Sequence, residues 1–538
     1  QLTMLSTQSK ILTILIVLAC SSQSIDGLRI LGLFPLHGKS HFVMCERLVK
    51  HLAQQGHQLD VYSHFPLKKP IPNHKDFSLN GTLPAIVNNM TYDFFKQFQS
   101  VDMAAMMSNV GNPVCELLST PVFQDLFKSL EKNQPYDLVI IEVFVSNCFL
   151  AWGRRLNVPM IGVMTSTLID WYNEPLGNPF NPAATPGCWS GLFHPMNFWE
   201  RLINTIMYHM ISAQFNYHIE VQNKYVEQYF GHGYPDVTEL PRDLDLLLVN
   251  THHSLDGVRA FTPAIIPVGG LHIVDDGEKL PEASIEFTKV QKWLDESKDG
   301  CIYFSFGSMV RIETFPKPIL AAIYATFENI APIRILMKIA KPEDLPPGLP
   351  SNVMTQSWFS QLQVLKHKNI KAFVTHGGLM STQESLYAGV PMIGVPLFGD
   401  QHLNVRVQVR QEIAVFVNHE EITEQSFTAA VKEILNNPIY KKNAESFSKK
   451  FFDRPMSPID TATFWIEYVA RHGKNALRSP VVDMPWWQVN LIDVYGFILL
   501  VLIIIGYIIK VVVKKILQFC CSSKSEDKRS KKAAKKIQ

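Results

Sequence analysis

One stretch, from Phe373 to Gln401, constrains the fold of this chain more than any other. It starts within a β-branched and aromatic run, residues 369–374, of the kind that forms buried parallel strands. Gly377 and Gly378 end that run and leave no side chain between the backbone and a ligand. A helix that stops at Gly389 and a second apolar run follow. The stretch therefore predicts a strand, a glycine turn, a helix and a second strand, and such a turn at a helix N-terminus is an anion site.

Polar side chains stand at the ligand-facing points of this predicted unit. His376 follows the first strand, and Glu384 falls in the first turns of a helix that Ser381 or Thr382 can cap. Residues 400–401, Asp-Gln, end the second strand, where ligands of open α/β sheets bind. These side chains point to a ligand with phosphate and ribose groups rather than to one more structural βαβ unit.

Position by position, the stretch from Phe373 to Gln401 resembles the signature of the UDP-glycosyltransferases, the family that includes the animal UDP-glucuronosyltransferases. The resemblance extends over almost the whole chain, and its details are most like those of an insect member. It implies an α/β fold of two Rossmann-like domains that face each other across a cleft, the arrangement called GT-B. It also implies an enzyme that transfers a sugar from a UDP-sugar to an acceptor.

Length and composition agree with two domains. A chain of 538 residues is too long for one core, and 47% hydrophobic with 18% charged residues describes a globular protein with membrane character. A net charge of +2 gives no electrostatic reason to expect nucleic acid. We expect an N-terminal acceptor-binding domain over 25–270 and a C-terminal UDP-sugar-binding domain over 271–480. The Pro-, Gly- and Asp-rich passage 259–281 reads as the hinge between them.

The N-terminus has the composition of a secretory signal. Lys10 precedes the apolar run 11–19 and a cluster of small polar residues, so we expect a signal peptide over 1–24. The sequence Asn-X-Thr occurs at Asn80 and Asn89, and both are expected to be glycosylated in the lumen.

The C-terminus has the composition of a membrane anchor. Residues 494–513 are long and apolar enough for a transmembrane helix, and the juxtamembrane segment 481–493 carries an interfacial Trp-Trp pair. The basic tail 514–538 belongs in the cytosol by the positive-inside rule. Its final Lys535-Lys536 resembles a retrieval signal of endoplasmic-reticulum membrane proteins. We expect a single-pass type I protein of that membrane, with its catalytic body in the lumen and membrane lipid as a partner.

The lumenal cysteines show no pattern. An odd number at irregular spacings indicates neither a metal site nor a disulfide framework. We expect most of them to be buried apolar side chains. They are Cys45, Cys115, Cys148, Cys188 and Cys301.

Two residues at predicted strand ends in the N-terminal half can carry the chemistry. His41 follows a strand over 28–34, with a helix expected from about Phe42, and Glu142 ends a strand that begins at 137. A histidine held by a carboxylate can remove a proton from a hydroxyl near neutral pH. The resemblance implies that His41 is the base and places Glu142 where vertebrate members show Asp, which leaves the pairing geometry open. His37 is the alternative base.

The resemblance also implies the donor contacts residue by residue. Met380 departs from the pattern, because vertebrate members show Asn there, and this favours glucose over glucuronic acid. The implied contacts are Ser308, Thr375, His376 and Gly377 for the diphosphate, Trp358 and Gln361 for the uridine, Glu384 for the ribose, Asp400 and Gln401 for the sugar hydroxyls, and Arg259 for the phosphates or the sugar.

These expectations combine into one hypothesis. His41 deprotonates a hydroxyl of a small lipophilic acceptor, which displaces UDP from the sugar, with inversion and without a metal or another cofactor. The Asp-Leu-Asp at 243–245 resembles a metal motif of other glycosyltransferases, but it precedes a strand and reads as a loop. UDP-glucose and a detoxification role are favoured. UDP-glucuronate, a lipid or protein acceptor, a non-catalytic binding protein and a homo-oligomer stay open.

Overall fold

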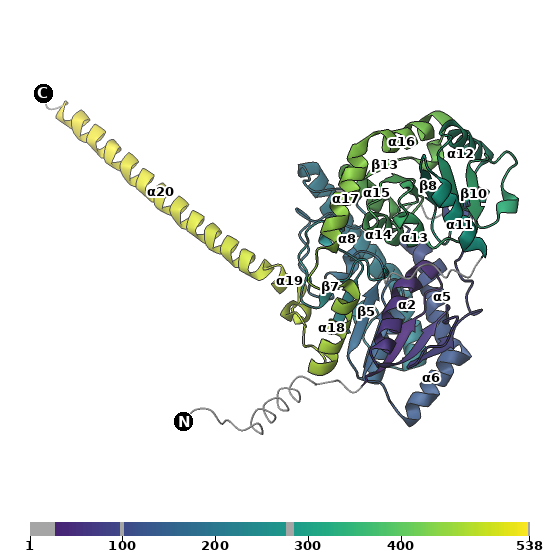
Figure 1. Ribbon diagram of the computed structural model, residues 1–538. Helices are drawn as coiled ribbons and strands as arrows, with labels where there is room; N and C mark the ends of the chain where they lie inside the picture. Colours follow the sequence, from purple (N-terminus) through teal and green to yellow (C-terminus); the bar gives the residue numbers. More distant parts are fainter. Residues whose placement is uncertain (1–26, 97–101, 276–284, 536–538) are drawn as a thin grey trace, which may run out of the picture. The chain divides into compact units, whose positions relative to one another are not determined.

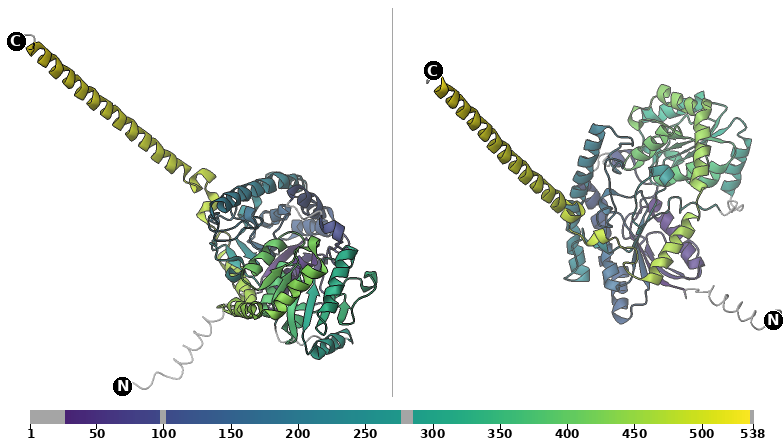
Figure 2. Two further views of the ribbon diagram at one scale, coloured as in Figure 1. Left: turned by 90° about the horizontal axis from the view of Figure 1, so that it is seen from above. Right: turned by 90° about the vertical axis from the view of Figure 1, so that its left-hand side faces the viewer.

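The computed structural model describes residues 27–96, 102–275 and 285–535, which form two units divided after Ser479. The predicted signal peptide, the end of the tail and residues 276–281 of the predicted hinge lie outside the described residues. The first unit contains two parallel sheets with helices packed around them, visible as two lobes in the right-hand view of Figure 2.

The N-terminal sheet has seven parallel strands in the order β3-β2-β1-β4-β5-β6-β7. Its central strands are continuous apolar runs because helices cover both faces of the sheet. The strands are β1 (Arg29–Phe34), β2 (Gln58–Ser63), β3 (His74–Ser78), β4 (Leu138–Glu142), β5 (Met160–Met164), β6 (Leu246–Val249) and β7 (Ile265–Pro267). The α-helices of this half are α2 (Lys39–Gln54), α3 (Tyr92–Lys96), α4 (Met103–Met106), α5 (Asn112–Glu116), α6 (Pro121–Lys132), α7 (Ala151–Leu156), α8 (Phe198–Ile219), α9 (Asn223–Phe230) and α10 (His253–Asp256).

The C-terminal sheet has six parallel strands in the order β10-β9-β8-β11-β12-β13. The strands are β8 (Cys301–Ser305), β9 (Arg334–Lys338), β10 (Val353–Gln356), β11 (Ile370–Thr375), β12 (Met392–Gly394) and β13 (Ala414–Phe416). The helices are α11 (Ile285–Glu296), α12 (Lys317–Asn329), α13 (Gln361–Lys366), α14 (Leu379–Tyr387), α15 (Gln401–Arg410), α16 (Glu424–Asn436), α17 (Pro438–Phe452) and α18 (Pro458–His472). Two doubly wound parallel sheets confirm the predicted fold class.

Helix α18 packs against the N-terminal sheet, although its position in the sequence suggested the C-terminal domain. The sequence placed it in the C-terminal domain, but its buried face (Ala462, Ile466 and Val469) joins the apolar core of the N-terminal sheet. Figure 1 shows α18 beside α2. The chain therefore passes from the first sheet to the second and then returns to the first.

A segment of the N-terminal half, residues 86–96, crosses in the opposite direction. The backbone N–H of Asn88 donates to the carbonyl of Ser308 at 2.8 Å, and that of Met90 donates to Met309 at 3.0 Å. Tyr92 and Phe95 are buried in the core of the C-terminal sheet. At its start, the N–H of Ile86 donates to the carbonyl of His37 at 2.8 Å, so the segment ties the loop after β1 to the loop after β8.

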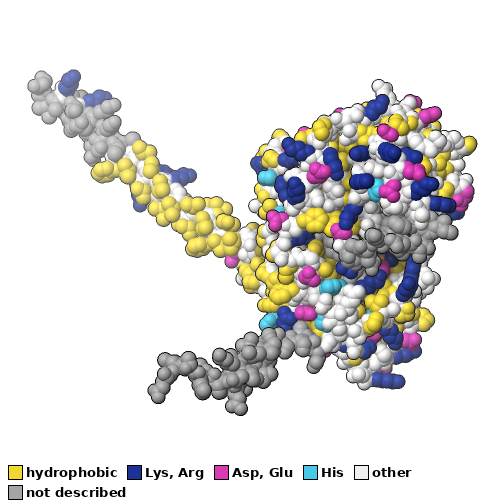
Figure 3. All heavy atoms as spheres, in the orientation of Figure 1, with side chains coloured by type: hydrophobic (Ala, Val, Ile, Leu, Met, Phe, Trp, Pro, Cys, Tyr) yellow, Lys and Arg dark blue, Asp and Glu magenta, His cyan; other side chains and the backbone are white. Residues whose placement is uncertain are grey.

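The second unit consists of α19 (Trp486–Val489) and α20 (Ile492–Ala534). Within the described residues, one helical stretch, Ile492–Phe519, is long and apolar enough to cross a membrane. Hydrophobic side chains cover the surface of this stretch in Figure 3. This agrees with the predicted anchor over 494–513.

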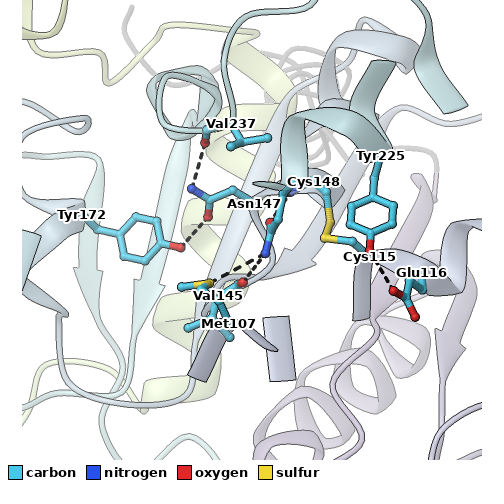
Figure 4. Close-up of a disulfide and its surroundings, with 10 residues drawn as sticks. Met107, Cys115, Glu116, Val145, Asn147, Cys148, Tyr172, Tyr225 and Val237 are labelled. Carbon is cyan, nitrogen blue, oxygen red and sulfur yellow. Dashed lines mark hydrogen bonds between the residues drawn. A yellow bond between two sulfur atoms is a disulfide. The ribbon is translucent and has the colours of Figure 1, made fainter. Parts of the chain in front are cut away.

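A disulfide joins Cys115 to Cys148, 33 residues apart. It links α5 to the short helix after β4, and Tyr225 donates a hydrogen bond to the neighbouring Glu116 at 2.8 Å (Figure 4). The absence of a visible disulfide pattern in the sequence was therefore misleading, because spacing alone does not specify a pairing. The other three of the five cysteines considered above, Cys45, Cys188 and Cys301, are buried and form no disulfide, as expected of apolar side chains.

Replacing both Cys115 and Cys148 with serine is expected to lower the free energy of unfolding by about 3 kcal/mol, because the unfolded chain regains the entropy of an open loop. The thermal unfolding midpoint of the purified full chain in detergent measures the effect. The matched control is Cys301→Ala, which removes a buried thiol without opening a loop. Equal midpoints for the wild type and the double variant would contradict the prediction.

Candidate active site

A cavity of about 1340 Å³ is lined by residues from both sheets. One wall comes from the loops after β1, β4 and β5 and from the segment that follows β3, and the other from the loops after β8, β10 and β11 together with the end of β9 and the start of α15. Both walls are thus built at the carboxyl ends of parallel strands, where ligands of open α/β sheets bind. His41 and His376 open onto this same cavity.

His41 forms a pair with Glu142 at the N-terminal wall. Helix α2 starts at Lys39, three residues earlier than expected, because Gly38 is the N-cap residue; His41 therefore lies in the first turn of the helix. Its Nδ1 lies 3.0 Å from Glu142 Oε1 and 2.9 Å from Thr165 Oγ1. The extra methylene of Glu relative to Asp is thus compatible with the pair. Since the carboxylate accepts, Nδ1 carries the proton and Nε2 keeps its lone pair.

The surroundings of His41 favour its protonated form. Burial alone lowers the pKa, but the hydrogen bond and charge of Glu142 and the charge of Asp400 raise the pKa of His41 above its ordinary value. His37 lines the same cavity, but burial and the charge of His41 lower its pKa. Its Nδ1 has no hydrogen-bond partner among the described residues. The geometry therefore favours His41 over His37 as a proton acceptor.

The glycine turn of the C-terminal wall opens onto a helix without a side-chain cap. Gly377 has φ +80°, and a Cβ there would lie 2.4 Å from a methyl carbon of Val405, so only glycine fits the turn. Helix α14 starts at Leu379 with Gly378 as its N-cap residue, and no side chain bonds to the first N–H groups. The prediction that Ser381 or Thr382 caps this helix was wrong: the helix begins earlier. The open N–H groups are free to bind an anion.

Three polar side chains surround this open helix end. Ser308 Oγ and His376 Nδ1 are buried, line the cavity and have no hydrogen-bond partner within the part of the chain that the structure describes. Lys338, at the end of β9, also lines the cavity, and its Nζ donates to Asn88 Oδ1. Burial lowers the pKa of Lys338 to about 8, and burial together with the charge of Lys338 lowers the pKa of His376 to about 3. A buried cation beside unpartnered donors is suited to a phosphate.

Lys338, the last residue of β9, has no role in the predictions from the sequence. The signal was available: polar residues at the carboxyl ends of parallel strands were the basis for selecting His41, Glu142 and His376.

Trp358 and Gln361, the predicted uridine contacts, and Glu384, the predicted ribose contact, all line the cavity. The Trp358 side chain is 54% exposed, which leaves a ring face open for stacking. Gln361 Nε2 donates to Glu384 Oε2 at 2.6 Å and to Ser381 Oγ at 2.9 Å. Burial raises the pKa of Glu384 to about 7 although Gln361 opposes this shift.

Asp400 and Gln401, the predicted sugar contacts, line the cavity at the start of α15 rather than at the end of β12 as expected. Asn404 Nδ2 donates to Asp400 Oδ2 at 2.9 Å, and Gln401 Oε1 accepts the backbone N–H of Leu397 at 2.9 Å. Burial raises the pKa of Asp400, and the charge of His41 opposes this shift. This interaction places Asp400 close to the catalytic candidate of the opposite wall.

Three of the predicted donor contacts do not line the cavity. Thr375 is buried below it, where Oγ1 accepts the N–H of Gly377 at 3.1 Å and fixes the glycine turn. Gly378, rather than Gly377, faces the cavity. Arg259 donates from Nε to the carbonyl of Asp256 at 3.2 Å, outside the wall.

Two other expected features have been placed by the structure. Asn80 and Asn89 both have exposed side chains, and Asn89 lines the mouth of the cavity. Within the Asp-Leu-Asp at 243–245, Asp245 is buried and accepts the N–H of Met160 at 2.9 Å, so it is a structural acceptor rather than part of a solvated loop. Across the described residues, no group of three His, Cys, Asp or Glu side chains is arranged to hold a metal ion.

The chain is similar to known proteins over nearly its full length. The family model "UDP-glucoronosyl and UDP-glucosyl transferase" matches residues 33–528. A relative from Dactylopius coccus, UDP-glucosyltransferase 2, is 34% identical over 97% of this chain and 99% of its own. Rat (Rattus norvegicus) UDP-glucuronosyltransferase 2B1 is 30% identical over 92% of this chain and 94% of its own.

A solved structure, described as the glycotransferase of kitacinnamycin, has the same fold, with a TM-score of 0.55 and 16% identity over 82% of this chain and 99% of that one. The family match, the fold and the cavity lined by residues of both halves of the chain point to the same activity. The chain belongs to the UDP-glucuronosyl and UDP-glucosyl transferase family and is a UDP-glycosyltransferase, an enzyme that transfers a sugar from a UDP-sugar to an acceptor.

Proposed function

We propose that this enzyme transfers glucose from UDP-glucose to a hydroxyl of a small lipophilic acceptor, with inversion at the anomeric carbon and His41 as the general base. One observation carries the proposal: the carboxylate-paired His41 and the uncapped start of α14 line the same cavity from opposite walls.

The chemistry follows from the side chains on each wall. The Nε2 lone pair of His41 takes the acceptor proton, and Glu142 stabilises the imidazolium that forms. The acceptor oxygen forms its bond to the anomeric carbon as the bond to UDP breaks, so the configuration inverts. Lys338, His376 and the N–H groups of α14 stabilise the negative charge on the departing phosphate. This scheme requires neither a metal ion nor another cofactor.

The distribution of charge supports glucose as the transferred sugar. Lys338 is the one Lys or Arg in the cavity wall as far as the described residues extend, and its charge lowers the pKa of His376, which supports a position near the phosphates. The sugar end presents Asp400 and Gln401, and an ionised Asp400 repels the carboxylate of glucuronate. The name of the relative UDP-glucosyltransferase 2 points to the same donor.

The acceptor side of the cavity supports a lipophilic acceptor. Its wall is apolar around His41 and provides few groups that could pair with a charged molecule. The apolar lining residues include Leu36, Val43, Phe94, Phe144, Ile169 and Trp189.

The cellular location is part of the proposal. A disulfide fits an oxidising compartment, and the stretch Ile492–Phe519 fits a single anchor. We infer a type I protein of the endoplasmic-reticulum membrane with the cavity in the lumen.

A donor panel tests this function. Microsomes carrying the enzyme are supplied with a simple phenol and either UDP-glucose or UDP-glucuronate, and the product is analysed by mass and by the coupling constant of its anomeric proton. We expect the β-glucoside from UDP-glucose at a rate at least tenfold above that of the glucuronide. A faster glucuronide would contradict the donor, and an α-glucoside would contradict the single displacement. Donor binding without transfer to any phenol, lipid or protein would support the non-catalytic alternative.

A further inference from the structure

We propose that His272 is a second ribose contact of the donor site, acting beside Glu384 on the hydroxyl groups of the nucleotide. This inference rests on the proposed UDP-sugar function and names a residue for which neither the sequence nor the family resemblance suggested a role. His272 lies in the connection between the two sheets, after β7 and before α11, and it lines the cavity on the uridine side.

The side chain of His272 is buried, and neither ring nitrogen has a well-formed hydrogen bond among the described residues, although the backbone of Met380 lies near enough to act on the ring. The side chain is only 1% exposed. Buried polar atoms in proteins are almost always satisfied, and the backbone of Met380 can serve only one of the two nitrogens, so the other nitrogen, on a cavity wall, indicates a missing ligand. Burial lowers the pKa of His272 to about 4, against the opposing effect of the backbone of Met380, so the ring is neutral near pH 7.

The position of His272 beside Glu384 suits a sugar hydroxyl. Its Nε2 lies 3.8 Å from Glu384 Oε1, too far for a hydrogen bond between the two. A hydroxyl oxygen placed between the two atoms can lie about 2.8 Å from both His272 Nε2 and Glu384 Oε1. A hydroxyl both donates and accepts, so it can pair with Nε2 in either tautomer of the imidazole while it or its neighbour donates to the carboxylate.

The backbone holds His272 in this place. The N–H of Gly270 donates to Gln383 Oε1 at 3.2 Å, which ties the turn before His272 to the residue next to Glu384 on α14. The N–H of Ile273 donates to the carbonyl of Gly270 at 2.9 Å and closes the turn. The imidazole is therefore fixed relative to the helix that carries the ribose carboxylate, as a ligand contact requires.

Analogues of the nucleotide test the assignment. The dissociation constants of UDP, 2′-deoxy-UDP and 3′-deoxy-UDP are measured by calorimetry on the full chain, for the wild type and for His272→Phe, which keeps the ring and removes its nitrogens. We expect the substitution to weaken UDP binding about tenfold and to leave binding of one of the deoxy analogues within about twofold, since that analogue already lacks the bond. His272→Gln, which restores a polar nitrogen, is expected to recover most of the loss.

Two further measurements separate this role from a structural one. The control His57→Gln changes a buried histidine that bonds to Glu467 outside the cavity wall, and it should leave all three dissociation constants unchanged. In Glu384→Gln, with His272 intact, UDP should still bind several-fold more tightly than 2′,3′-dideoxy-UDP. This second test holds even if His272→Phe fails to fold.

Two outcomes would overturn the inference: an equal loss for UDP and both deoxy analogues in His272→Phe, or no residual preference for UDP in Glu384→Gln. Failure of the proposed function looks different. If the wild type discriminates among these nucleotides through His272 but transfers no sugar, the ribose contact stands and the proposed glucosyl transfer does not.

Discussion

His41→Ala is expected to lower kcat for glucosyl transfer by about 10²–10⁴-fold, the usual contribution of a general base. The side chain lies on the wall opposite the phosphate site, so the dissociation constant for UDP should stay within about twofold. Initial rates at saturating UDP-glucose and phenol, together with calorimetric titration of UDP, measure both quantities on one preparation. An unchanged kcat would remove His41 as the base, and His37→Ala then tests the alternative on the same wall.

The pH profile distinguishes a base from a structural histidine. His41 must be neutral to accept a proton, and its pKa lies above the ordinary value of histidine, so kcat is expected to fall as the pH drops through that raised pKa. Glu142→Gln removes the charge that raises the pKa of His41. The acid limb of the profile should therefore move to lower pH, while the maximal rate falls because the imidazolium is less stabilised. An unchanged pH profile in Glu142→Gln would mean that the contact between His41 and Glu142, at 3.0 Å, does not set the pKa of the catalytic base.

Lys338→Met is expected to weaken UDP binding by about 10²–10³-fold, because truncation of a buried charged partner costs on the order of 3–4 kcal/mol. Methionine keeps the length and apolar packing of the stem and removes the ammonium group, with its charge and its hydrogen bond to Asn88. Uridine has no phosphate, so its dissociation constant should not change. Because burial lowers the pKa of Lys338 to about 8, UDP affinity in the wild type should also decline as the pH rises above about 8.

The matched control is Lys341→Met, which removes the same charge from an exposed position three residues away. It should leave UDP binding within about twofold, since exposed charges are screened. An equal loss of UDP affinity in Lys338→Met and Lys341→Met would indicate a long-range electrostatic effect of the net charge rather than a direct contact of Lys338 with a phosphate. A parallel loss of uridine binding in Lys338→Met would indicate a distorted pocket.

The sequence predicted the parts of the fold that depend on local patterns. Apolar runs such as 369–374 marked the buried strands, and glycine turns after them marked the edge where the cavity lies. Because side chains at the carboxyl ends of parallel strands in one sheet converge, His41 and Glu142 could be expected near each other without coordinates, whereas the approach of His376 from the second sheet was implied by the family resemblance alone. The predicted α/β fold with two facing Rossmann-like domains follows from the same patterns together with the family resemblance.

Features that depend on distant contacts could not be read in the same way. The pairing of Cys115 with Cys148 requires the helix after β4 to pack on α5, and nothing local encodes that approach. The first residue of α14 was misplaced because Ser381 and Thr382 are good caps in isolation, while tertiary packing starts the helix at Leu379. Arg259 was assigned to the donor by position alone, and the backbone after α10 directs it to Asp256 instead.

The return of α18 to the first sheet determines how this chain can be divided. A polypeptide cut at residue 270 would leave its sheet without the apolar cover that Ala462, Ile466 and Val469 provide, and the complementary piece would carry that cover with nothing to place it on. Residues 285–457, in turn, would lack Tyr92 and Phe95, which the segment 86–96 buries in the core of the second sheet. Each half therefore depends on a segment from the other part of the chain, and the core of the first sheet can be completed only after α18 has been synthesised.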